Sequence, residues 1–356
     1  MDNRDHHIIN QRSGKTYRHR QAGGFGKIRD QEASTGICRS GMRLPYPALP
    51  ANMTLQAGLL DDASTLLREC GSSLHLADAP SLALEYARLL GDVPPYITSY
   101  QHVPDACYSL MQTVEAECGA GASDRFLRLV TAVEILELPA RLATAHLPLS
   151  VLQEINWSVG ETLKAMRSPR PGYFTHRNDS FSKALAVCRL KLLPCGIELF
   201  DSSSGIARST LWKSGLSGGI AFARAWLEMG GHQPVLIGHW DARKIRDFSP
   251  EGYRRMYLVL AELLNAREEY LGVGGQSWWF DPVLASISPE LAFLRSESAG
   301  HGAYFIPMPT DEVATAQALK MSSRRQALYR EGRYQPKSYF WFWPRRRLLR
   351  WAEKHG

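Results

Sequence analysis

The periodicity of apolar residues changes at one place along this chain, the segment SPRPGY (168–173). Before it, apolar residues recur at i, i+3, i+4 and i+7, which is the pattern of amphipathic helices. Asp or Ser precedes several of these segments, as at a helix start. The N-terminal half is therefore predicted to be a helical bundle. Its predicted helices are 57–70, 81–91, 106–118, 123–145 and 149–166.

Beyond this segment, short apolar runs are separated by Gly and Pro and alternate with amphipathic stretches, which predicts strands and helices in turn. We expect an α/β or α+β fold, with the helical half packed on a mixed sheet. The predicted strands are 185–193, 196–202, 234–240, 269–275, 303–308 and 337–343. The predicted helices are 217–229, 250–267, 288–296 and 310–330.

The net charge of +7 is unevenly distributed. Residues 1–43 contain nine Lys and Arg against four Asp and Glu, and residues 320–356 contain eleven against two. We expect a basic, disordered tail at 1–43, a helical domain at 44–168, an α/β domain at 169–319 and a basic, aromatic lobe at 320–356. Basic ends on an acidic body favour an anionic partner, such as nucleic acid, a membrane surface or a phosphorylated cofactor.

The sequence also indicates a compartment. It has no apolar window long enough for a spanning helix and no secretory signal, so we expect a cytoplasmic protein. The six cysteines are scattered without metal-ligand spacing, which argues against structural zinc and against a disulfide framework. No metal site is predicted.

The glycine-rich segment Gly215–Gly219 precedes a predicted helix, where free backbone N–H groups suit a phosphate or another anion. It also matches G-x-S-x-G, the pattern of a serine nucleophile elbow. Ser217 is then the candidate nucleophile, with Asp281 and His301 as partners in the required chain order. Such an elbow needs a preceding strand, and RSTLW is a weak one. The candidate anion-binding glycines are Gly215, Gly218 and Gly219.

His239 and Asp241 follow the apolar run PVLI and lie two apart, so they share one face at the end of a predicted strand. Catalytic groups of α/β proteins collect at such ends. His239 is therefore a candidate catalytic base. The alternative is a half-buried histidine that is satisfied by a backbone carbonyl.

The segment Gly272–Pro282 combines glycines with three consecutive aromatic residues and an Asp-Pro pair. Aromatic residues on a strand face both sides, and the glycines allow close approach of a ligand or of another backbone. Gly272, Gly274 and Gly275 are candidate cofactor-binding residues, and Asp281 is a candidate catalytic residue. A bulged strand with core aromatics is the alternative.

Residues 328–336 carry the pattern Leu-Tyr-x-x-Gly-x-Tyr-x-Pro before a predicted strand. This pattern resembles the helix–strand junction of the GNAT acyltransferase superfamily, L-Y-x-x-x-G-F, with one residue fewer and Tyr334 in place of Phe. The resemblance implies an acyltransferase-like C-terminal half and acyl-CoA as a co-substrate. It also implies that Tyr329 protonates the departing thiolate. The superfamily's pyrophosphate-binding pattern, Q/R-x-x-G-x-G/A, does not occur here.

The C-terminal segment places four aromatic residues (340–343) before three arginines (345–347) and Trp351. Three interpretations remain open. The segment could contact a membrane interface through Trp and Arg, or a nucleic acid strand through stacking and phosphate contacts. It could also be a buried strand followed by a capping helix.

Together these features favour an N-acyltransferase that moves an acyl group from a CoA or carrier-protein thioester to an amine, such as that of an amphiphile at the inner face of the membrane. His239 or Asp281 would deprotonate the amine, and backbone N–H groups near Gly272–Gly275 would hold the oxyanion. No permanently bound cofactor is expected. The alternatives are a non-enzymatic protein that docks on membrane or nucleic acid, and a serine hydrolase that uses Ser217.

Overall fold

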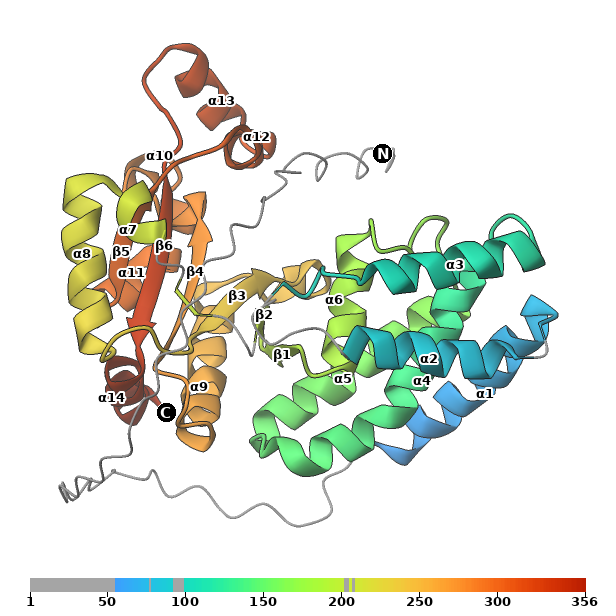
Figure 1. The fold of residues 1–356 in the computed structure, drawn as a ribbon. Helices are drawn as coiled ribbons and strands as arrows, with labels where there is room; N and C mark the ends of the chain where they lie inside the picture. The colour runs from blue at the N-terminus through green and yellow to red at the C-terminus, as the bar shows by residue number, and fades with distance from the viewer. Residues whose placement is uncertain (1–54, 77, 92–98, 202–204, 207–208) are drawn as a thin grey trace, which may run out of the picture. The chain divides into compact units, whose positions relative to one another are not determined.

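Helices alone make up the first part of the described chain. The computed structural model describes residues 55–76, 78–91, 99–201, 205–206 and 209–356 (Figure 1). The expected tail at 1–43 lies outside them. The helices are α1 (Ala57–Leu74), α2 (Ala79–Gly91), α3 (Asp105–Cys118), α4 (Ala122–Ala145), α5 (Leu149–Arg167) and α6 (Asp179–Cys188). Helix α4 contacts α1, α2, α3 and α6, because its apolar residues are buried on several sides. Helices α1 to α5 confirm the five predicted helices of this half, and α6 was not predicted.

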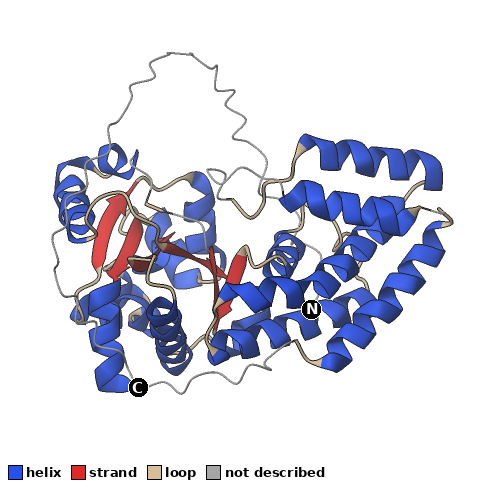
Figure 2. Ribbon diagram, turned by 60° about the horizontal axis from the view of Figure 1, so that its bottom comes forward, coloured by secondary structure: helices blue, strands red, loops and turns tan. Residues whose placement is uncertain are grey.

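The second part holds a mixed sheet of six strands in the order β1-β2-β3-β4-β6-β5 (Figure 2). Strands β3 and β4 are parallel, and the other neighbours are antiparallel. The strands are β1 (Leu192–Cys195), β2 (Glu198–Asp201), β3 (Leu236–Trp240), β4 (Gly272–Ser277), β5 (Tyr304–Met308) and β6 (Ser338–Pro344). The structure confirms the mixed α/β class, with the helices mostly in the N-terminal half.

The remaining elements connect and cover the strands. They are α7 (Ser209–Lys213), α8 (Gly215–Glu228), η1 (Ala242–Asp247), α9 (Pro250–Ala266), η2 (Trp278–Phe280), α10 (Leu284–Ile287), η3 (Pro289–Leu291), α11 (Phe293–Gly300), α12 (Glu312–Lys320), α13 (Ser323–Arg330) and α14 (Arg345–His355). No described helix is long and apolar enough to cross a membrane.

The strand register defines two faces of the sheet, since directly paired residues point to the same side. One face, here called the tryptophan face, carries Trp240, Trp341 and Trp343. Tyr257 of α9 packs there against Trp343 at 5.1 Å and against Trp351 of α14 at 5.7 Å between ring centroids. The core on this side is therefore aromatic.

The opposite face, here called the histidine face, carries His239, Gln276 and the two β6 phenylalanines, Phe340 and Phe342. Helix α8 covers its β5–β6 end, where Phe222, Ala225 and Met229 join a buried cluster with the two phenylalanines. The β3 end of this face is instead lined by polar groups.

The described residues form one compact unit, and a continuous apolar core runs from Leu55 to Ala352. Core residues of the helical half, such as Ile155, belong to the same cluster as Leu193 and Leu199 of the sheet. The helices and the sheet therefore bury their apolar surfaces against each other.

Three element predictions are wrong in detail, and one of them, the helix 288–296, is instead the turn η3 followed by helix α11. Residues 185–188 are the end of helix α6 and not the beginning of a strand. Asn178 caps the N-terminus of this helix, since its side chain accepts from the Phe181 N–H. Residues 184–188 at the end of this helix are all buried, so periodicity alone does not separate their apolar run from a buried strand. The predicted helix 310–330 is two helices, because the Ser322 hydroxyl caps a second helix by accepting from the Arg325 N–H.

Candidate functional site

The carboxyl ends of strands β3 and β4 separate from each other. The two strands pair at Leu236 with Val273 and at Ile237 with Gly274, yet β3 continues to Trp240 and β4 to Ser277. Beyond these two positions, the register gives no further β3–β4 pair. Both ends belong to parallel strands, and ligands of α/β proteins bind beyond such ends.

His239 lies on the histidine face at this point. Its register partner is Leu199 of β2, and its ring meets the edge of the Tyr100 ring at 4.9 Å between centroids. The Nε2 atom is buried and has no hydrogen-bond partner among the described residues. Buried polar atoms are nearly always satisfied by protein, water or ligand, so an unpaired one marks a place where a ligand or water can bind.

The His239 imidazole is neutral at physiological pH. Burial lowers the pKa of His239 to about 4, and the positive charge of Lys183 adds to this effect. The carboxylates of Asp201 and Asp179 oppose the shift. A neutral imidazole can accept a proton, and the two carboxylates would then stabilise the cation.

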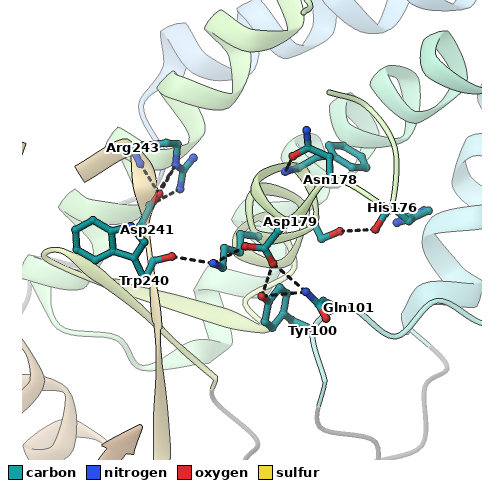
Figure 3. A network of polar contacts seen from close by, with 11 residues as sticks. Tyr100, Gln101, His176, Asn178, Asp179, Trp240, Asp241 and Arg243 are labelled. Carbon is teal, nitrogen blue, oxygen red and sulfur yellow. Dashed lines mark hydrogen bonds and ion pairs between the residues drawn. The ribbon is translucent and has the colours of Figure 1, made fainter. Parts of the chain in front are cut away.

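A network of polar contacts centred on Asp179 supports the site from helix α6 (Figure 3). One carboxylate oxygen accepts from the Tyr100 hydroxyl at 2.6 Å and from the Gln101 amide at 2.9 Å. The other lies 2.6 Å from Lys183 Nζ, which also donates to the Trp240 carbonyl at 2.8 Å. Burial would raise the pKa of Asp179, but the charge and hydrogen bonds of its partners lower it. The network therefore ties α6 to the end of β3.

The tryptophan face of the same gap is closed by aromatic rings. Trp240 meets Trp279 at 5.5 Å and Phe248 at 5.2 Å between centroids, with both pairs edge to face. On the histidine face, by contrast, Gln276 at the end of β4 is exposed. At the end of β4, the side chain on the histidine face is therefore exposed, whereas the tryptophan face is covered.

Asp241 and Asp281, which lie in two of the motifs described above, accept hydrogen bonds from backbone N–H groups. Asp241 accepts three hydrogen bonds from the Arg243 side chain and one from its N–H, and Arg243 also donates to Ser158 at 3.0 Å. Asp281 is buried, and its two carboxylate oxygens accept from the N–H groups of Val283 and Lys337, each at 3.1 Å. Asp281 thus joins the turn after η2 to the start of β6.

The glycines of β4 are packed under the aromatic residues of β6. A Cβ at Gly272 would lie 2.5 Å from a ring carbon of Phe342, and one at Gly274 would lie 2.6 Å from the Trp341 carbonyl oxygen. Gly275 differs, because its nearest neighbour would be the Gly238 carbonyl oxygen of β3 at 3.7 Å. Close packing accounts for the first two glycines, and Gly275 lies beside Gly238 of β3 with room for a Cβ.

The second glycine segment joins helices α7 and α8. Gly215 has a φ of +68°, and a Cβ at Gly218 would lie 2.5 Å from that of Ser214. Gly219 lies in the same helix. Helix α7 precedes this turn, so the strand–turn–helix context of a nucleophile elbow is not present there. The Ser217 side chain is outside the described residues.

The remaining predicted residues lie on other elements. Tyr329 is on α13 and is 42% exposed. His301 ends α11 and faces Glu297 and His355 rather than a serine. The C-terminal aromatics are buried, with Phe342 and Trp343 at 0% exposure, so their structural interpretation is the one that the fold supports.

The site residues that sequence reasoning missed are Tyr100, Gln101, Asp179 and Lys183. The first two precede α3 and the last two belong to α6, so all four are distant from His239 in the sequence. The i, i+4 spacing of Asp179 and Lys183 was the available signal.

No protein-family model matches this chain, and searches of curated proteins and of solved structures found no match.

Proposed function

We propose that this protein is an N-acyltransferase that moves an acyl group from a CoA or carrier-protein thioester to an amine. The observation that supports it is the separation of β3 and β4 beside the neutral His239. Open strand edges recognise extended ligands through backbone hydrogen bonds. The pantetheine arm of CoA and of acyl carrier proteins is an extended chain with two amides, which suits such a gap.

The chain's own residues would then act as follows. The amine attacks the thioester carbonyl, an N–C bond forms, and one amine proton passes to His239 Nε2. Backbone N–H groups at the Gly275 edge of β4 would stabilise the oxyanion. The C–S bond breaks, and the thiolate takes a proton. We assign this last proton to Tyr329 because of the family resemblance. The products are an amide and a free thiol.

The test measures thiol release from acyl-CoA esters of several chain lengths with a panel of amines. We expect amine-dependent release, and we expect His239→Asn to lower it by about 100-fold or more, the usual contribution of a general base. The matched control is His176→Asn, because His176 is also buried with its pKa lowered to about 4. No release with any amine, or equal rates in both variants, would contradict the proposal.

A second candidate function is docking on an anionic membrane, through helices α7 and α8 rather than through the C-terminal aromatics. Trp212, Ile220 and Leu227 are 83%, 60% and 71% exposed, and the cations Lys213 and Arg224 are exposed on the same helices. Apolar side chains beside cations are the composition of an interfacial helix. An amphiphilic amine at the membrane would then lie near the enzyme.

Vesicle sedimentation tests this candidate. We expect binding to vesicles that contain phosphatidylserine and weak binding to purely zwitterionic ones. The double substitution Trp212→Ser with Ile220→Ser should reduce binding several-fold, whereas Met321→Ser, at a residue that is 84% exposed on another segment, should not. Equal binding by both variants would rule out α7–α8 as the contact surface.

A further inference from the structure

Three potential metal ligands meet where helix α11 ends beside helix α14. Glu297 and His301 are four residues apart, so they lie on one side of α11, and His355 is in the last turn of α14. One ligand atom from each residue lies within 4.8 Å of the other two. Two imidazoles and one carboxylate are a donor set that zinc and related divalent ions bind.

The core orients two of these ligands. The Trp351 indole N–H donates at 2.7 Å to Glu297 Oε1, the same oxygen that faces His301 Nε2. Trp351 itself is 1% exposed and packs against Trp343 at 5.7 Å between ring centroids. The Glu297 carboxylate is therefore held by a residue that cannot move without disturbing the core.

His355 is oriented in the same way. Its Nδ1 lies 2.7 Å from the Trp351 carbonyl oxygen, and its ring stacks on the Trp351 ring at 4.9 Å. A carbonyl oxygen only accepts, so Nδ1 must carry the proton, and the lone pair is then on Nε2. A hydrogen bond from the second ring nitrogen to a carbonyl is the usual support of a metal-binding histidine.

The third ligand is free to adjust. His301 Nε2 lies 4.0 Å from Glu297 Oε1, and the two side chains are 37% and 40% exposed. Ligands of a tetrahedral zinc ion at about 2.1 Å lie roughly 3.4 Å apart. A shift of the exposed His301 Nε2 by roughly 0.6 Å closes that difference.

We propose that Glu297, His301 and His355 form a binding site for a divalent transition metal ion of the zinc class. The ion would link α11 to α14 and keep open coordination positions toward solvent, since His301 and Glu297 are partly exposed. This site is independent of the proposed acyl transfer, because it uses none of the residues around His239.

The test titrates the metal-free full-length protein with Zn²⁺ in a chelator competition assay and with Co²⁺ in visible absorption. We expect one equivalent of metal to bind with the d–d bands of a low-coordinate Co²⁺ ion, together with a rise in melting temperature. His301→Ala, His355→Ala and Glu297→Gln should each weaken binding about tenfold or more. His232→Ala, at an exposed histidine elsewhere, is the control and should bind like the wild type.

Either of two results would contradict the proposed metal site. Either the wild type binds no metal at micromolar concentrations, or the three ligand variants bind it as tightly as His232→Ala does. His301→Ala is the decisive variant, because this side chain is exposed and its loss should leave the metal-free melting temperature unchanged.

Discussion

Strands β6 and β3 both carry aromatic residues before charged ones, but they have different places in the sheet. Strand β6 pairs with β4 on one side and with β5 on the other over most of its length. Strand β3 pairs with β2 at four positions but with β4 at only two. The first strand is almost entirely buried, whereas four of the five β3 residues are partly exposed.

The comparison shows that strand pairing, rather than composition, decides which segment is buried in the core and which belongs to the candidate site. The run of four aromatics before three arginines has the composition of a surface that binds membranes or nucleic acids. Pairing on both edges instead places it inside the sheet, between β4 and β5. The shorter motif around His239 lies where pairing ends, and polar groups from distant segments collect there.

The largest expected effect tests the burial of β6. Trp343→Ala should lower the free energy of unfolding by about 3–5 kcal/mol, because the cavity would lie between Tyr257 and Trp351. Trp212→Ala, at a residue that is 83% exposed, should change it by less than about 0.5 kcal/mol. Urea denaturation measures both values. Similar losses in the two variants would mean that β6 is not the core strand described above.

The next effect compares the same substitution at two glycines of β4, Gly272 and Gly275. Gly272→Ala should cost about 1–3 kcal/mol, because its Cβ would meet the Phe342 ring of β6 at 2.5 Å. Gly275→Ala should stay within about 0.5 kcal/mol, because its Cβ would face the Gly238 carbonyl oxygen of β3 at 3.7 Å. The measurement is again denaturation by urea. If Gly275→Ala is the more costly change, close packing against Phe342 does not account for the glycine at position 272.

The smallest effect concerns Glu198, which pairs with Trp240 at the end of β3 and accepts from the Tyr253 hydroxyl at 3.0 Å. Burial raises the pKa of Glu198 to about 7. At pH values just below 7, the Glu198 carboxyl is therefore protonated in the folded state but ionised in the unfolded state. The stability that the protonated carboxyl contributes is lost as pH rises through about 7.

Between pH 5.5 and 7.5, the wild type should lose roughly 1–2 kcal/mol relative to Glu198→Gln, whose amide does not titrate. Parallel unfolding curves across this pH range provide the measurement. An identical pH dependence in the two proteins would show that the Glu198 carboxyl is already ionised in the folded state.

The sequence predicts most elements but few of the site's contacts. Amphipathic helices and apolar strands follow from local periodicity, so the bundle and the strands were predictable. The end of α6 was not, because residues 184–188 are all buried and apolar runs of that length also occur in buried strands. His239 was predictable from its place after an apolar run. Tyr100 and Lys183 were not, since only the tertiary fold brings them to His239.

The strand order has a consequence for synthesis of the chain. Strand β5 pairs only with β6 in the described sheet, and α12 and α13 are made between them. Until residues 338–344 have been translated, β5 has no partner and the outer edge of β4 is open. Unpaired edges beside apolar side chains are templates for aggregation. Nascent chains that stall between β5 and β6 should therefore depend most on chaperones.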